Sequence, residues 1–201
     1  MAQRLKEEVR DRILAAAGEA FATHGYDAAR LADIAAQAGT SASNLYKYYD
    51  GKAALFDAVV TPKRVEAFRR VLRARIDELA LRPDWSQADA GGSSRARELL
   101  ETWIEQRWLA VILMRGAQGT GYAHVRRELI DEMTRRALRS REAGSRRSAE
   151  LRFVLRQIFE RTLDTLSAIL VEHDDPDAIR RAVGHFWRYQ LAGLQALVRN
   201  A

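Results

Sequence analysis

The sequence has no cysteine, only three prolines and no long uninterrupted hydrophobic run. Without cysteine, the chain cannot form disulfides, bind zinc through thiolates or use a cysteine nucleophile. No apolar stretch approaches the roughly 20 residues that cross a bilayer, and the N-terminus is charged instead of carrying a signal peptide. These absences predict a cytoplasmic protein with no membrane association.

The sequence also lacks an assembled set of catalytic or metal-binding residues. His24, His124, His173 and His185 are scattered, with no spacing typical of metal ligands and no nucleophile beside them. The glycine-rich stretch 114–122 has neither the lysine nor the preceding strand of a phosphate-binding loop. We therefore expect no catalytic residue, no metal and no cofactor, and we keep a small all-α enzyme as a remote alternative.

The charge is positive overall but unevenly placed. The formal net charge is +6, with 47% hydrophobic and 30% charged residues, which is typical of a folded globular chain. Lysine plus arginine balances aspartate plus glutamate over residues 1–52, so bulk charge does not identify a nucleic-acid surface. Between Ile34 and Phe56 the only acid is Asp50, and it lies near Lys47 and Lys52.

Hydrophobic residues recur at helical spacing along most of the chain, and β-branched alternation is absent, so the predicted fold class is all-α. Leu5, Val9, Ile13, Ala17, Ala20 and Phe21 form one stripe of a first helix that Gly25 is expected to end. We expect two domains: an N-terminal DNA-binding domain over 1–56, and a helical effector-binding and dimerisation domain over 57–201. A polar loop is expected over 82–94, a glycine-rich break at 116–121 and an arginine-rich connector at 140–148. The last two helices are predicted at 149–171 and 176–198.

Residues 30–49 carry the pattern of a helix-turn-helix. Leu31 and Ile34 begin a short helical stripe, Gly39 supplies a turn residue that tolerates positive φ, and Ser41 is placed to cap the next helix. Leu45 and Tyr49 give that helix an inward face, so its other residues are left to face outward.

Residues 13–56 resemble the DNA-binding domain of TetR-family bacterial transcription regulators. The matching residues are Ile13, Leu14, Ala17, Phe21, Gly25, Tyr26, Ile34, Ala35, Ala38, Gly39, Ser41, Leu45, Tyr46, Tyr49, Lys52 and Leu55. The resemblance implies a bacterial repressor, associated with the nucleoid when it is bound to DNA. It also implies phosphate contacts from Tyr46 and Lys52.

The expected DNA-binding residues are Arg30, Thr40, Ser41, Ala42, Ser43, Asn44, Tyr46, Lys47, Tyr48 and Lys52. Asn pairs with adenine, while lysine and tyrosine hydroxyl groups suit phosphates. Ala29 departs from the family, which usually has a helix-capping threonine there, and Gly51 departs from its serine or asparagine, which leaves Asp50 as the expected cap of the fourth helix.

The two C-terminal helices carry apolar residues on more than one face, which indicates burial against a partner subunit. The expected dimer interface comprises Leu151, Leu155, Ile158, Leu166, Val183, Trp187, Leu191 and Leu194, with Gly184 and Gly193 permitting close approach. In the resembled family these helices form a four-helix bundle, so the operator is expected to be palindromic double-stranded DNA.

An unknown small-molecule effector is expected to bind among the middle helices. The residues expected to line its pocket are Trp103, Gln106, Arg107, Ile112, Met133, Phe153, Gln157, Phe186 and Tyr189. Large apolar residues at helical spacing also serve as core filler, which is the alternative interpretation of these residues. A TetR-like protein controlled by a protein partner, or acting as an activator, is the alternative that the sequence leaves open.

Overall fold

The computed structural model describes residues 2–81, 92–139 and 149–200. All regular secondary structure in these ranges is α-helical, which confirms the all-α prediction. The helices are α1 (Ala2–Ala28), α2 (Leu31–Gln37), α3 (Ala42–Leu45), α4 (Lys52–Val59), α5 (Pro62–Ala80), α6 (Ser94–Glu105), α7 (Arg107–Arg115), α8 (Val125–Arg139), α9 (Ala149–Glu172) and α10 (Pro176–Asn200). Most of the polar loop and all of the arginine-rich connector lie outside the described residues.

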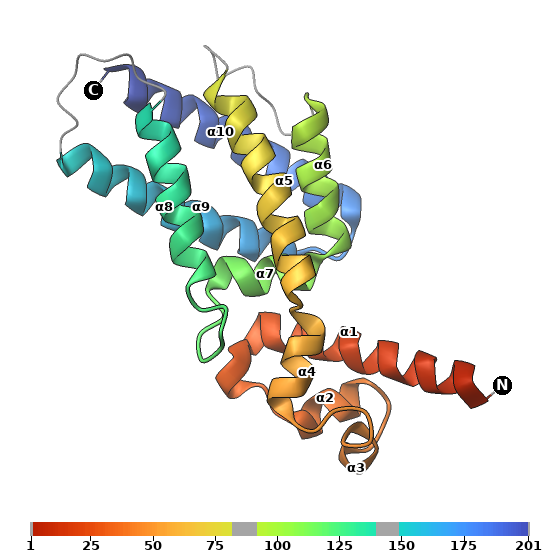
Figure 1. The fold of residues 1–201 in the computed structure, drawn as a ribbon. Helices are drawn as coiled ribbons and strands as arrows, with labels where there is room; N and C mark the ends of the chain where they lie inside the picture. Colours follow the sequence, from red (N-terminus) through yellow and green to blue (C-terminus); the bar gives the residue numbers. More distant parts are fainter. Residues whose placement is uncertain (1, 82–91, 140–148, 201) are drawn as a thin grey trace.

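The helices form two groups joined through α5 and α7 (Figure 1). Helices α1 to α4 lie together at one end, and α5 to α10 form a longer bundle above them. Helix α7 lies between the groups and packs against both α1 and α9. A change in the bundle can therefore reach the N-terminal group through either of two helices.

The N-terminal group is built around large side chains that are excluded from solvent. Ile13, Ile34, Leu45 and Leu55, which come from four different helices, are each 0% exposed. Gly25 has φ 79° and interrupts α1, as the sequence predicts. Leu5 was predicted on the buried stripe, but it is 57% exposed because the first turns of α1 project beyond the other helices (Figure 1).

Helices α4 and α5 are separate elements. Val60 has φ −109° and ψ 78°, and Thr61 then caps α5 by accepting a hydrogen bond from the Arg64 backbone N–H, with Pro62 in the first turn. The Arg64 side chain donates back to the carbonyl of Val59 at 2.6 Å and to Gln106 at 3.4 Å. Burial lowers the pKa of Arg64. The joint between the two groups is thus bridged by one partly buried arginine.

Helix α7 is fastened to α1 at both of its ends. The Trp108 side chain lies against Gly18, where an added Cβ would meet the Trp108 Cβ at 3.4 Å. At the other end, Arg115 donates to the carbonyl of Ala22 at 2.9 Å, and Gly116 ends the helix in the left-handed conformation. Because both ends contact the same helix, α7 and α1 are held as one unit.

The structure places most of the expected dimer-interface residues inside the protomer. Leu151, Leu155, Leu166, Val183, Leu191 and Leu194 are buried within the protomer, and Ile158 and Trp187 are half-buried. The wide apolar band is explained by packing of α9 against both α7 and α8, which covers two faces at once. Among the described side chains of α9 and α10, the large apolar residues left exposed are Phe153, Val154 and Tyr189. Gly184 and Gly193 have no atom within 4 Å of an added Cβ, so neither marks a close approach inside the protomer.

Among the described helices, none combines the length and the apolar character that crossing a membrane requires.

Candidate functional site

The turn between α2 and α3 has the geometry of a helix-turn-helix. Gly39 has φ 67°, a conformation that glycine adopts without steric cost, and the Thr40 backbone N–H donates to the carbonyl of Ala35 at 2.9 Å. Ala38 is buried immediately before the glycine. Together these features reverse the chain in three residues and fix α3 relative to α2.

The start of α3 is held by side-chain hydrogen bonds. Ser41 Oγ accepts from the backbone N–H of Asn44 at 3.1 Å, which confirms the predicted cap. Asn44 Nδ2 donates to Thr40 Oγ1 at 2.8 Å, and Ser41 and Ser43 share a hydrogen bond at 3.0 Å. The amide of Asn44 is thereby oriented by its neighbour before any base is present.

Helix α3 is anchored on one face and free on the other. Leu45 is fully buried and Tyr49 is 7% exposed, and Arg10 Nε donates to the Tyr49 hydroxyl at 3.4 Å. This hydrogen bond raises the pKa of Arg10. Tyr46 is 56% exposed, and Lys47 is exposed beside it. The outward face therefore presents a phenol and an ammonium group next to the helix start.

The ammonium group of Lys52 lies against the C-terminal end of α1 instead of extending freely into solvent. Lys52 Nζ donates to the carbonyls of Asp27 at 3.0 Å and Ala29 at 3.3 Å. It also lies 4.7 Å from the centroid of the Tyr26 ring. Two of its three N–H donors are thus used inside the protein, so Lys52 has a structural task that the sequence did not indicate.

The starts of α2 and α4 lie at the two positions, 29 and 51, where the sequence departs from the family pattern. Ala29 is buried and Arg30 occupies the N-cap of α2 without a side-chain cap, so the exposed guanidinium group of Arg30 is available at that end. The expected cap at Asp50 is wrong: Gly51, with φ 141°, is the N-cap of α4 and supplies no side-chain bond.

The other expected DNA-binding residues lie on the same segment but are not equally accessible. Ser41 and Ser43 are exposed, whereas Thr40, Ala42, Asn44, Tyr48 and Lys52 are half-buried. The most accessible set therefore consists of Arg30, Ser43, Tyr46 and Lys47, with Ser41 at the cap.

The comparisons with known proteins bear on this segment. Residues 13–59 match the family of bacterial regulatory proteins described as the tetR family. This chain carries the DNA-binding domain of TetR-family regulators. The match spans α2, α3, α4 and most of α1, which contain the turn described above. The chain is thus a DNA-binding regulator of transcription.

Two further comparisons add little to the match of the N-terminal domain. The fatty acid degradation regulator FadR from Bacillus halodurans is a similar solved structure, with 21% sequence identity. The match covers 89% of this chain and 97% of that chain, with a TM-score of 0.42. A likeness at this level carries no argument about the present chain. A search of curated proteins found no match.

The bundle formed by α5 to α10 contains an apolar cavity bounded by α5, α6, α8, α9 and α10. The cavity has about 670 Å³ of space that is free of atoms when its open mouth is included. Only about 80 Å³ of this space can hold the centre of a water molecule, so the cavity is narrow. Its described wall consists of Leu72, Arg75, Ile76, Leu79, Ala80, Leu99, Met133, Arg136, Ala137, Phe159, Trp187, Leu191 and Leu194.

Of the residues expected to line an effector pocket, Met133 alone lies on this described wall. Trp103 and Ile112 are buried in the core, and the indole nitrogen of Trp103 has no hydrogen-bond partner. Phe153 and Tyr189 are 63% and 77% exposed, because they point away from the bundle. These four residues therefore lie off the described wall of this cavity.

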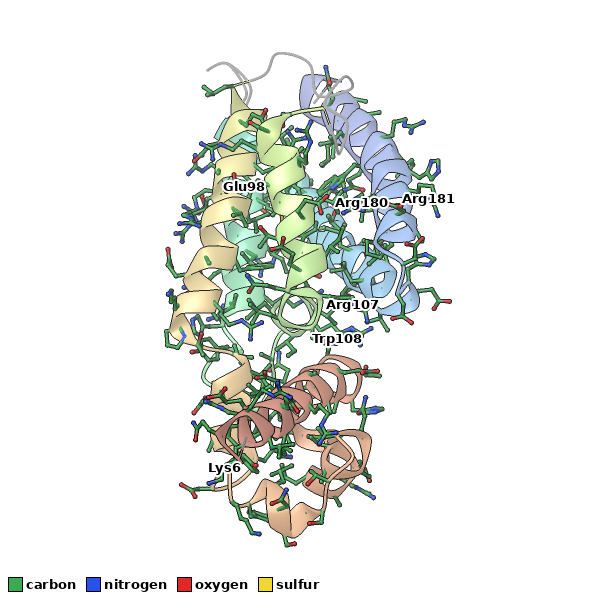
Figure 2. The ribbon with its side chains drawn as sticks, turned by 90° about the vertical axis from the view of Figure 1, so that its right-hand side faces the viewer. Lys6, Glu98, Arg107, Trp108, Arg180 and Arg181 are labelled. Carbon is green, nitrogen blue, oxygen red and sulfur yellow. The ribbon has the colours of Figure 1, made fainter. Side chains whose placement is uncertain are left out.

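The remaining expected pocket residues have other contacts. Gln106 and Arg107 border a separate hollow between α1, α5 and α7. Arg107 stacks over the Trp108 ring at 4.0 Å, donates to the His173 carbonyl at 2.8 Å and pairs with Asp174 at 2.9 Å. Figure 2 shows Arg107 and Trp108 at the level where the bundle meets α1.

Gln157 and Phe186 are also outside the described cavity wall. Gln157 donates to Glu160 at 3.3 Å, and the Phe186 ring lies 5.7 Å from that of Trp187. Phe186 thus supports a wall residue without lining the cavity itself.

Sequence reasoning missed the α5 side of the cavity. Leu72, Ile76 and Leu79 recur at helical spacing, and Arg75 interrupts their stripe. A charged residue on an apolar helix face was the available signal, since such a residue needs a buried partner. In the described part of the chain, no group of three or more metal-ligating side chains is gathered to hold an ion.

Proposed function

We propose that this TetR-family regulator is a repressor that binds a palindromic operator as a homodimer and is released by a small-molecule effector. The observation that carries DNA binding is the outward face of α3, where Ser43, Tyr46 and Lys47 lie beside a helix start fixed by internal hydrogen bonds. The buried side chains of Leu45 and Tyr49 pack into the core beneath this face.

The polar residues of this face divide into two chemical roles. Tyr46, Lys47 and Arg30 suit phosphate oxygens, which set affinity and orientation. Ser41, Ser43 and Asn44 lie at the helix start, where small polar side chains reach base edges in the major groove, while Thr40, Ala42 and Tyr48 flank them. Asn44 is already bonded to Thr40, so its free carbonyl oxygen and remaining N–H are the groups offered to a base.

A two-fold dimer is supported by exposed apolar residues on α9 and α10. Phe153 and Val154 on α9 and Tyr189 on α10 are large apolar side chains exposed to solvent, and a dimer contact would cover them. A dimer formed there brings two α3 helices to one DNA. An operator with half-sites ~34–36 Å apart fits this arrangement.

The proposed release follows from how α5 connects the cavity to α4. One end of α5 lines the cavity at Leu72 and Leu79, and its other end meets α4 across the joint held by Arg64. An effector that displaces α5 therefore moves α4 and the neighbouring α3. Linkage requires that DNA weakens effector binding by the same factor as the effector weakens DNA binding.

The DNA-binding proposal is tested by fluorescence anisotropy on duplex DNA from upstream of the chain's own gene. We expect Tyr46→Phe and Lys47→Met to weaken binding, with Lys47→Met flattening the salt dependence by about one unit. Lys63→Met, at an exposed position on α5, is the matched control and should leave affinity unchanged. Equal losses from Lys47→Met and Lys63→Met would show that α3 is not the interface.

The dimer proposal is tested by light scattering on purified protein. We expect Tyr189→Glu to shift the chain from dimer to monomer, because it places a charge in an apolar contact. Arg70→Glu, at an exposed site on α5, should not change the mass. A Tyr189→Glu variant that remains dimeric excludes this surface as the interface.

A further inference from the structure

The described cavity wall contains two cationic side chains, and whether each is already paired with a carboxylate decides which ligands the cavity can bind. Arg75 and Arg136 are the charged members of the described wall, and the other members are apolar or aromatic. The described wall includes no carboxylate. A ligand of either charge therefore depends on how these two guanidinium groups are already paired.

Arg75 is held in a hydrogen-bonded cluster that includes Glu78 and Ser93. It is 7% exposed, and its Nη1 donates to Glu78 Oε2 at 2.8 Å and to Ser93 Oγ at 3.2 Å. Ser93 Oγ in turn donates to the same Glu78 oxygen at 2.8 Å. The carboxylate of Glu78 therefore neutralises Arg75 inside the protein.

Arg136 is paired in the same way on α8. Its Nε donates to Glu132 Oε1 at 2.9 Å, and its Nη1 contacts Asp77 Oδ1 on α5. Burial raises the pKa of Glu132, but the hydrogen bond from Arg136 and the charges of Arg135, Arg136 and Arg73 together lower it. Glu132 is thus ionised at neutral pH, and the second guanidinium group is also neutralised.

Both charged ligand classes are disfavoured by this pairing. An anion has to compete with Glu78 or Glu132 for a guanidinium group, and a cation finds no carboxylate on the described wall. A charged ligand of either sign would lose its hydration in the cavity without gaining an unpaired protein charge, and this costs free energy in an apolar space. An uncharged chain loses only unfavourable contact with water.

We propose that this cavity binds an uncharged, unbranched apolar molecule. The narrow shape favours a single hydrocarbon chain over a fused ring system, and the open mouth lets a polar end remain in water. This inference rests on the proposed effector control, and it names the chemical class of the effector.

The test is isothermal titration of the full-length chain with three probes that share one hydrocarbon chain: 1-octanol, octanoate and octylammonium. We expect saturable binding of 1-octanol and at least tenfold weaker binding of both charged probes. Trp187 lies on the wall, so 1-octanol should also change tryptophan emission in the wild type, and Trp187→Phe should remove that change.

Two variants locate the binding. Ala137→Leu fills the cavity from a buried wall position and should weaken 1-octanol binding at least tenfold. Ala36→Leu makes the same change at an exposed site on α2 and should have no effect. Leu191→Phe fills the cavity from α10 and replaces Ala137→Leu if that variant does not fold.

Each outcome bears on a separate statement. Equal affinity for a charged probe, no binding of any probe, or unchanged 1-octanol binding after the cavity is filled overturns the proposed ligand class. If 1-octanol binds in the cavity but leaves operator affinity unchanged, the ligand class stands and effector-controlled release fails.

Discussion

Replacing Lys52 with methionine should destabilise the N-terminal domain, because its ammonium group bridges two helices. The substitution keeps most of the apolar stem but removes the hydrogen bonds to the Asp27 and Ala29 carbonyls and the contact with the Tyr26 ring. Hydrogen bonds to charged groups contribute about 1.5–3 kcal/mol when buried. Lys52 is half-buried, so we expect a total loss of about 1–2 kcal/mol after allowance for solvent screening.

The assay is urea unfolding of the wild type and of Lys52→Met, with Lys47→Met as the matched control. Lys47 is exposed in the turn that follows α3, so the same substitution there should cost less than about 0.5 kcal/mol. Equal stability of Lys52→Met and the wild type would refute the structural role of the ammonium group.

The same pair of variants separates structure from DNA contact. If the ammonium group of Lys52 is occupied by its hydrogen bonds to the two carbonyls, Lys47→Met should flatten the salt dependence of operator binding more than Lys52→Met does. An equal change in slope would show that Lys52 also contacts a phosphate, as the family resemblance implies.

Three further predictions concern stability. Leu45→Ala should cost about 2–5 kcal/mol in urea unfolding, because the side chain is fully buried under α3, while Ser43→Ala should change little. Gly119→Ala should destabilise by about 1–2 kcal/mol, since φ is 78° and the added Cβ meets Asp27, whereas Gly121→Ala has open space; equal losses would contradict this. The hydrogen bond from Arg180, which is labelled in Figure 2, lowers the pKa of Glu101 below its ordinary 4.5. The bridge between α6 and α10 therefore stabilises the fold above that pH and is lost on further acidification. Thermal unfolding of Glu101→Gln should therefore depend less on pH in the acid range, and an unchanged pH dependence would exclude the bridge.

The sequence determined the features that depend on local chemistry. Apolar spacing predicted the all-α fold and the two long C-terminal helices. Gly39 and Ser41 predicted the turn and the cap of α3, because positive φ and N-cap hydrogen bonds are properties of a few neighbouring residues. Tyr49 was correctly assigned to an inward face for the same reason.

Tertiary structure decided which apolar faces meet and which charges pair. Leu155 and Leu191 fit an interface pattern, yet they are buried in the protomer, because helical periodicity shows that a face is covered without showing what covers it. The Lys52 bridge joins residues 25 positions apart and leaves no local signal. Arg75 on an apolar helix face indicated a buried partner, but Ser93, 15 positions beyond Glu78, joins that pair only in the tertiary structure. The cavity likewise exists only where five helices fail to fill the space between them, which depends on three-dimensional packing.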